Sequence, residues 1–212
     1  MTITKEKFCS IRPFAYHLTS VDNLSSIRAT GCLESAASML ERDGQAELTR
    51  KRRPWRAKVF LNGAGVWLQS QAPLYVRNIL FCQGWGLEDL LGRLNSLVFF
   101  WPGTEDGPNI YGKRHLESAS WDGSVAILRT STAALFGANG SLCPLLCRFN
   151  SGSPRYSKGQ ASPRGPNTFV PIEEFEGTSS DVAELTFPGR VVLPNDTEVR
   201  VTANGNWELF LL

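Results

Sequence analysis

The sequence predicts an α+β fold in which small helices pack against antiparallel β-sheets, within one domain that covers residues 1–212. Short apolar runs suited to buried strands recur along the chain, and the clearest is Leu-Val-Phe-Phe-Trp at residues 97–101. Short helical segments lie between these runs, and this mixture is typical of the α+β class. With 212 residues, 42% of them hydrophobic, the chain can bury one substantial core.

The first elements are a strand and a helix in direct succession. Residues 14–18 form the expected strand, and Ser20 is well placed to cap the helix that follows. Apolar residues recur along this helix at helical spacing, and Gly31 ends it. A second short helix is expected over about residues 35–42.

A β-hairpin is expected next. Its extended segments are residues 59–61 and 66–68, and the Asn-Gly pair at 62–63 supplies the tight turn. Pro73 is expected to open a further helix, because proline is favoured at the first helical position. Residues 87–94 form the helix after that.

The second half of the chain adds strands to the sheet. The strand at 97–101 is expected to stop at Pro102-Gly103, residues 104–122 to form a loop with some helix, and residues 131–136 to form a short helix. The remaining expected strands are residues 125–128, 182–187, 191–193 and 198–202, with residues 207–212 closing the sheet.

Composition excludes several classes of protein. No run approaches the roughly 18 apolar residues of a membrane span, and no apolar stretch of signal-peptide length follows the N-terminus. We therefore expect a cytoplasmic protein with no membrane partner. The five cysteines are scattered and the chain has only two histidines, His17 and His115, so we expect reduced thiols and no metal site.

The net charge of +2 conceals two basic segments. One is a loop near residues 44–58, in which six positive charges surround one tryptophan, and the other is a long Gly/Ser/Pro-rich loop near residues 150–168. These segments are either ordinary solvated loops or a surface for a nucleic-acid backbone. The candidate nucleic-acid-binding residues are Arg52, Trp55, Arg56, Arg155 and Arg164.

His17 is the first candidate for chemistry, and two interpretations are open. A histidine among apolar neighbours can be a core residue hydrogen-bonded to the backbone. A histidine at a strand end, with a helix N-terminus just beyond, can instead offer a neutral donor and free amides to ribose hydroxyls or phosphate.

Glu184 is the second candidate. Strand alternation places it on one face with Thr186. That face is either solvated, as one face of many antiparallel sheets is, or it lines a cleft. In a cleft, the carboxylate can stabilise an oxocarbenium-like centre and orient an attacking nucleophile.

Three segments resemble DarT-type DNA ADP-ribosyltransferase toxins. Residues 16–27, Tyr-His-Leu-Thr-Ser-Val-Asp-Asn-Leu-Ser-Ser-Ile, with Gly-Cys-Leu at 31–33, resemble the opening strand of that family and its Asp-Asn-Leu helix. Leu-Val-Phe-Phe-Trp-Pro at 97–102 is similar to its Val-Pro-Phe-Tyr-Phe strand. Val-Ala-Glu-Leu at 182–185 resembles its late Ala-Glu strand, which supplies the catalytic glutamate.

Most of the chain is similar to an uncharacterised family related to these toxins. The shared pattern includes a Gln-x-Pro-Leu step at 71–74, an Asn-Ser-Gly loop at 150–152, Arg-Gly at 164–165 and Thr-Phe at 168–169. Those relatives often have Arg-Asp before the Gln-x-Pro-Leu step, where this chain has Gln-Ser at 69–70.

The resemblance implies an ADP-ribosyltransferase-like fold, a split pair of antiparallel sheets that grips NAD as its substrate. His17 would bond the adenosine-side ribose, and Asn23 would help to hold the nicotinamide or the phosphates. Glu184 would contact the nicotinamide ribose as the C–N bond breaks. The remaining residues expected to bind NAD are Thr19, Phe99 and Trp101; the two aromatic rings suit stacking and the core equally.

DarT proteins also use an arginine in a loop after the first helices. Arg50, Arg52, Arg53 and Arg56 all fall in that region of this chain. Of these we assign Arg53 as the catalytic partner of Glu184.

The expected function is therefore mono-ADP-ribosyl transfer: cleavage of NAD at the nicotinamide–ribose bond and transfer to an acceptor such as a nucleobase in DNA or RNA. By resemblance alone, a toxin role and an antitoxin protein as partner would follow. NAD glycohydrolysis is an alternative, as is a non-catalytic module that binds nucleic acid or protein. RNA 2′-phosphotransfer also begins with a His-x-Thr strand, but it needs basic residues at fixed places that this sequence does not show.

Overall fold

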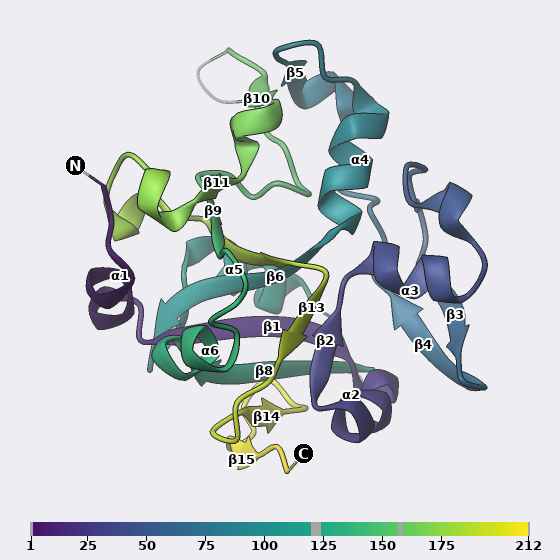
Figure 1. Ribbon diagram of the computed structural model, residues 1–212, viewed down its shortest axis with the longest axis vertical. Coiled ribbons are helices and arrows are strands. Elements are labelled where there is room, and N and C mark those ends of the chain that lie inside the picture. The colour runs from purple at the N-terminus through teal and green to yellow at the C-terminus, as the bar shows by residue number, and fades with distance from the viewer. Residues whose placement is uncertain (1, 120–123, 157–158, 212) are drawn as a thin grey trace.

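The centre of the molecule is a nine-stranded antiparallel sheet. The computed structural model describes it together with the rest of residues 2–119, 124–156 and 159–211 (Figure 1). Its strands are β1 (Phe14–Ser20), β6 (Leu97–Thr104), β7 (Gly107–Pro108), β8 (Val125–Ser131), β9 (Leu145–Cys147), β11 (Val170–Pro171), β12 (Glu184–Pro188), β14 (Glu198–Arg200) and β15 (Glu208–Leu209). The spatial order is β11-β9-β12-β6-β1-β8-β14-β15, and β7 pairs with β6. The α+β class expected from the sequence is confirmed.

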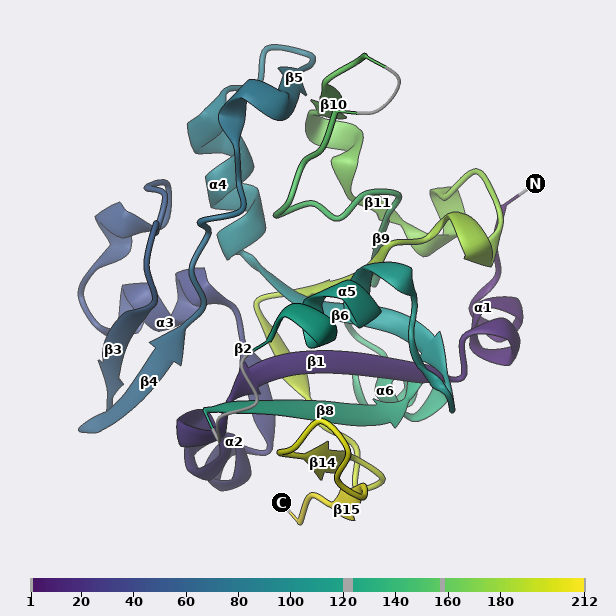
Figure 2. The same ribbon diagram turned by 180° about the vertical axis from the view of Figure 1, so that it is seen from behind.

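Short helices cover both faces of this sheet. They are α1 (Lys5–Ile11), α2 (Leu24–Thr30), α3 (Ala36–Arg42), α4 (Leu87–Asn95), α5 (Ile110–Ser118) and α6 (Thr132–Ala138). Shorter 3-10 turns lie at Val21–Asn23, Ala46–Leu48, Val76–Asn78, Pro166–Thr168, Ile172–Glu174 and Ser179–Asp181. Figure 2 shows α5 in front of the sheet and α6 behind it. The longest of these helices have nine residues, and among the described residues none can cross a bilayer, which takes about 20.

The main core lies on the face that α1, α2 and α6 cover. Phe8, Ile27 and Leu135 from these helices join sheet residues such as Val98 and Phe100 in one buried cluster. On the opposite face, Leu116 of α5 packs against Tyr16 and Ile127 of the sheet. The alternation of side chains along β1 and β8 therefore feeds two cores.

Three two-stranded units surround the main sheet. β2 (Cys32–Glu34) pairs with β13 (Arg190–Val192), and β3 (Ala57–Leu61) forms a hairpin with β4 (Ala64–Leu68). β5 (Ile79–Phe81) pairs with β10 (Ser162–Arg164), and this pair is parallel, unlike the antiparallel pairing expected from the sequence. α3 packs on the hairpin, and the apolar side of α4 forms a separate core cluster.

Local signals placed several elements correctly. The Ser35 hydroxyl caps α3 by accepting from the Ser38 amide at 3.2 Å. Gly31 ends α2 with a φ of 61°, and Asn62 and Gly63 have φ values of 51° and 81°, as a tight hairpin turn requires. Ser20, in contrast, makes no side-chain cap; a 3-10 turn separates it from α2.

Two expectations about proline are wrong. No α-helix follows Pro73; the chain makes a 3-10 turn and then β5, because the extended residues 79–81 find hydrogen-bonding partners in the distant strand β10. β6 does not stop at Pro102 but continues to Thr104. Gly103 permits this continuation, since a Cβ there would clash with the Gly107 carbonyl of the paired strand β7.

The sheet splits beside β6. Residues 97–100 of this strand pair with β12, whereas residues 101–103 pair with β1. The pairing of β1 with β6 covers only Phe14 to Tyr16, although β1 itself runs on to Ser20. The two strands therefore separate at His17, and the structure leaves a space there for a site.

Candidate functional site

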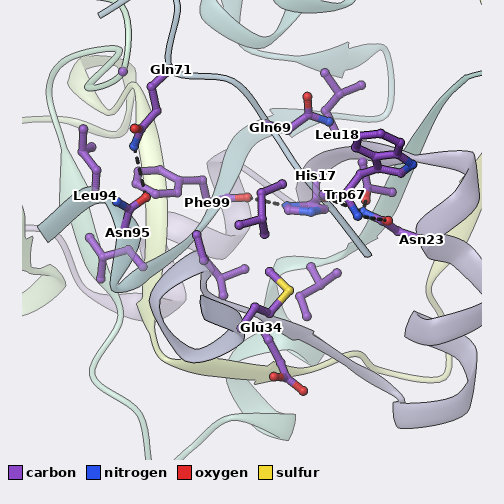
Figure 3. A pocket seen from close by; sticks show the side chains of 18 of the residues that line it. His17, Leu18, Asn23, Glu34, Trp67, Gln69, Gln71, Leu94, Asn95 and Phe99 are labelled. Atoms are coloured by element: carbon purple, nitrogen blue, oxygen red, sulfur yellow. Dashed lines mark hydrogen bonds between the residues drawn. The ribbon is translucent and has the colours of Figure 1, made fainter. Parts of the chain in front are cut away.

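A cavity of about 460 Å³ opens where β1 and β6 separate. Its walls come from β1 and α2, from β4 and the segment after it, from the end of α4, and from β6 (Figure 3). The residues that the sequence assigns to catalysis and NAD binding all line this cavity: His17, Thr19, Asn23, Arg53, Phe99, Trp101 and Glu184. Segments far apart in the chain thus converge on one site.

His17 spans the gap between the diverging strands. Its Nδ1 lies 2.8 Å from the carbonyl oxygen of Phe99 (Figure 3). Because a carbonyl can only accept, Nδ1 carries the hydrogen and a neutral ring leaves Nε2 as an acceptor. Burial lowers the pKa of His17, which favours this neutral form. Nδ1 of His17 is therefore hydrogen-bonded to the backbone, as in a core histidine. Nε2 makes no hydrogen bond to a described residue.

Glu184 is the first residue of β12 and is 4% exposed. Asn109 fixes the chain just before it, since its side-chain amide donates to the carbonyls of Val182 (3.2 Å) and Ala183 (2.8 Å). Oε1 of Glu184 accepts from the Ser151 amide at 3.0 Å. Oε2 is buried and has no partner among the described residues, so a lone carboxylate oxygen is available inside the protein.

The electrostatic setting of Glu184 makes its charge sensitive to the environment. Burial raises its pKa to about 7, although the hydrogen bond from Ser151 and the charge of Arg164 oppose the rise. Burying a carboxylate without a full set of hydrogen bonds or a counter-charge costs folding free energy, and such groups are found mostly at functional sites. At neutral pH a cation next to Oε2 would favour the ionised form.

Arg164 supports the loop beside Glu184 from within the protein. It is 1% exposed, and its guanidinium donates to the Asn150 carbonyl at 3.1 Å and to the Ser162 hydroxyl at 2.7 Å. The guanidinium also lies 4.7 Å from the ring centroid of Phe149. Contrary to the sequence-based expectation, Arg164 is therefore not on a surface that can contact a nucleic acid.

Arg53 lines the cavity as part of a polar network. Its Nη1 donates to Asn95 Oδ1 at 2.9 Å, and its backbone amide donates to Gln71 Oε1 at 3.0 Å. Gln71 also donates to Asn95 Oδ1, at 3.1 Å (Figure 3). Burial lowers the pKa of Arg53 to about 10, so the guanidinium stays charged at neutral pH. Among the described residues, no carboxylate pairs with it.

Asn23 holds the cavity wall together. Its amide oxygen accepts from the Trp67 amide at 2.8 Å, and its nitrogen donates to the Trp67 carbonyl at 2.9 Å (Figure 3). The same nitrogen lies 3.3 Å from the Thr19 hydroxyl. These bonds fasten β4 to the turn after β1. The Asn23 amide is therefore hydrogen-bonded within the protein, whereas the resemblance implied that it contacts NAD.

A profile described as a family of unknown function, DUF7002, matches residues 13–197. The chain belongs to the DUF7002 family. The matched segment contains every residue named above for the cavity, from His17 to Glu184. No curated protein and no solved structure matches the chain.

The cavity residues without a role assigned from the sequence include Gln71, Asn95, His115 and Asn150. The His115 ring stacks on Trp101, with centroids 5.0 Å apart, and its Nε2 lies 3.0 Å from the Asn150 amide nitrogen. Gln71 and Asn150 belong to the Gln-x-Pro-Leu and Asn-Ser-Gly patterns of the sequence. No sequence pattern includes Asn95 or His115, because helix packing brings them to the cavity.

The other candidate nucleic-acid-binding residues differ in their contacts and exposure. Arg52 donates to the carbonyls of Gln71 (3.2 Å) and Ala72 (2.6 Å), which ties the basic loop to the segment beside the cavity. Arg56 donates to the Ser20 hydroxyl at 3.0 Å. Trp55 is 80% exposed, and Arg155 is exposed outside this cavity. The segment 150–168 includes residues 157–158, which lie outside the described residues.

Across the described part of the chain, no three histidine, cysteine or acidic side chains gather as metal ligands would. The cavity offers hydrogen-bonding side chains and the Arg53 guanidinium, which has no carboxylate partner among the described residues. Its volume falls within the roughly 300–1,000 Å³ that small-molecule sites occupy.

Proposed function

We propose that this protein is a mono-ADP-ribosyltransferase that cleaves NAD at the nicotinamide–ribose bond and transfers ADP-ribose to an acceptor. The observation that carries the proposal is the buried carboxylate of Glu184, whose Oε2 has no partner among the described residues. It lines the same cavity as the neutral His17 and as Arg53, which pairs with no described carboxylate. A carboxylate and a guanidinium in one cavity suit a substrate with a cationic and an anionic part.

Glu184 would act at the bond that breaks. As the C–N bond lengthens, positive charge develops on the ribose C1′, and an ionised carboxylate in a water-poor cavity stabilises that charge strongly. The Ser151 amide holds the carboxylate in one orientation, so little reorganisation is needed. The cationic nicotinamide ring itself favours the ionised form of Glu184 once NAD is bound.

His17 and Arg53 would hold the rest of NAD. A neutral imidazole with a free Nε2 accepts a hydrogen bond from a ribose hydroxyl, and Nδ1 is fixed by the Phe99 carbonyl. In the Arg53 guanidinium, Nη1 donates to Asn95 Oδ1 and Nε donates to the Gln69 carbonyl. Its remaining nitrogen suits a phosphate oxygen of the pyrophosphate.

The fold is compatible with the proposal. The resemblance to DarT-type proteins implies a split pair of antiparallel sheets, and in this antiparallel sheet β1 and β6 are paired only up to Tyr16. The three resembling segments, residues 16–27, 97–102 and 182–185, contribute His17, Phe99 and Glu184 to the cavity formed there.

Incubation with NAD labelled in its adenylate half tests the proposal. We expect the wild-type protein to release nicotinamide and to move the label to an acceptor when DNA, RNA and protein mixtures are supplied separately. Label found only in free ADP-ribose would mean that the protein is an NAD glycohydrolase and not a transferase. Absence of nicotinamide release, together with no thermal shift at millimolar NAD, would contradict the proposal and favour a non-catalytic binding module.

A further inference from the structure

A second cavity, of about 870 Å³, lies next to the first. Pro73, His115 and Asn150 line both cavities and so form the boundary between them. Asn150 directly precedes Ser151, whose amide holds Glu184. The second cavity thus adjoins the site where NAD is proposed to break.

The second cavity has a strongly positive wall. Three exposed arginines line it, Arg114 from α5, Arg148 after β9, and Arg155, and its described lining contains no aspartate or glutamate. Arg148 lies 4.6 Å from the ring centroid of Phe175. Arg114 and Arg155 make no hydrogen bond or ion pair with another described residue. Unpaired guanidinium groups in a concave site favour an anion, and phosphate most of all because it accepts several such bonds.

The boundary between the cavities supplies no free base. The Asn150 amide nitrogen can only donate, so the His115 Nε2 at 3.0 Å accepts, and the neutral ring carries its hydrogen on Nδ1. Burial, and after it the charge of Arg155, lower the pKa of His115. The effect of Arg155 also shows that a positive charge acts close to the boundary. His115 therefore offers an incoming acceptor no base, and an acceptor that is already deprotonated needs none.

We infer that the second cavity is the acceptor site and that it takes a molecule with a terminal phosphate. This inference rests on the proposed function. A phosphate monoester carries a charge of about −1.5 to −2 at pH 7, so its oxygen is a nucleophile without help from a base. Tyr111 and Tyr156 also line the cavity and offer ring faces to the remainder of such a molecule.

The transfer step balances without a proton. One phosphate oxygen forms a bond to C1′ of the ADP-ribosyl group, and the bond between C1′ and the nicotinamide nitrogen breaks. The electron pair of that bond leaves with nicotinamide, which becomes neutral. The negative charge of the attacking oxygen is lost in the new bond, and the guanidinium groups hold the remaining phosphate oxygens.

Uridine 5′-monophosphate and uridine are matched probes, since they differ only in the phosphate. We expect calorimetry on the wild-type protein to show binding of the monophosphate at least about tenfold tighter than that of uridine. The double variant Arg114→Gln/Arg155→Gln should lose that preference, whereas Arg28→Gln, an exposed arginine of α2 outside both cavities, should keep it. With NAD present, mass spectrometry should detect ADP-ribose joined to the phosphate. Oligonucleotides with and without a 5′-phosphate then show whether the natural source is a free nucleotide or a strand end.

Equal binding of the two probes, or an unchanged preference in the double variant, would overturn the inference even if the wild-type protein releases nicotinamide. Transfer to unphosphorylated uridine or to a protein side chain would overturn it as well. Phosphate-selective binding without any nicotinamide release would support the assignment of the second cavity and overturn the proposed function.

Discussion

Glu184→Gln is expected to lower the rate of nicotinamide release by about 10²–10³-fold while NAD binding largely persists. Glutamine keeps the shape of the side chain and can still accept from the Ser151 amide, but it has no negative charge to stabilise the developing cation. The contribution is large because Glu184 is 4% exposed and water screens it little. Single-turnover release of nicotinamide gives the rate, and calorimetry gives the Kd for NAD.

Glu174→Gln is the matched control, because Glu174 is exposed on a 3-10 turn away from the cavity. Its release rate should equal that of the wild type. Since the pKa of Glu184 lies at about 7, wild-type release should also rise with pH through that region as the carboxyl ionises. A Glu184→Gln protein that releases nicotinamide at the wild-type rate would remove Glu184 from the reaction.

The second large effect concerns stability. Burial raises the pKa of Glu184 from 4.5 to about 7, so between these values the folded protein holds its proton more tightly than the unfolded chain does. The contribution of this group to the free energy of unfolding is therefore complete below pH 4.5 and is lost as pH rises through about 7. The loss amounts to about 3 kcal/mol. Glu184→Gln has no titrating group at this position, so its free energy of unfolding does not show this loss.

Urea unfolding of the wild type and of Glu184→Gln, without NAD, measures this difference at pH 4.5 and at pH 8. The stability of the variant relative to the wild type should increase by about 3 kcal/mol between the two pH values. Glu174→Gln should follow the wild type throughout. A constant difference between Glu184→Gln and the wild type would mean that the buried carboxyl titrates normally.

Local signals in the sequence account for much of the fold. The helix end at Gly31, the Asn-Gly turn at 62–63 and the apolar run at 97–101 depend on neighbouring residues, and the structure places each as expected. β5 depends on β10, which lies far along the chain, so the apolar spacing after Pro73 predicted a helix instead. Non-local pairing of this kind leaves no mark within a short window of sequence.

The candidate site shows the same division. His17 and Glu184 could be picked out because each sits in a recognisable strand, and the structure brings both to one cavity. The burial of Arg164 could not be foreseen, since a basic, Gly/Ser/Pro-rich segment resembles a solvated loop. His115 escaped notice because only the packing of α5 on β6 brings it against Trp101.

A crystal structure of Glu184→Gln with NAD bound tests the central claim most directly, because the variant should bind NAD without consuming it. We predict the nicotinamide ribose beside residue 184, a pyrophosphate oxygen on Arg53, and a hydroxyl of the adenosine ribose on Nε2 of His17. NAD bound outside the cavity between β1 and β6, or its nicotinamide ribose far from residue 184, would contradict the account.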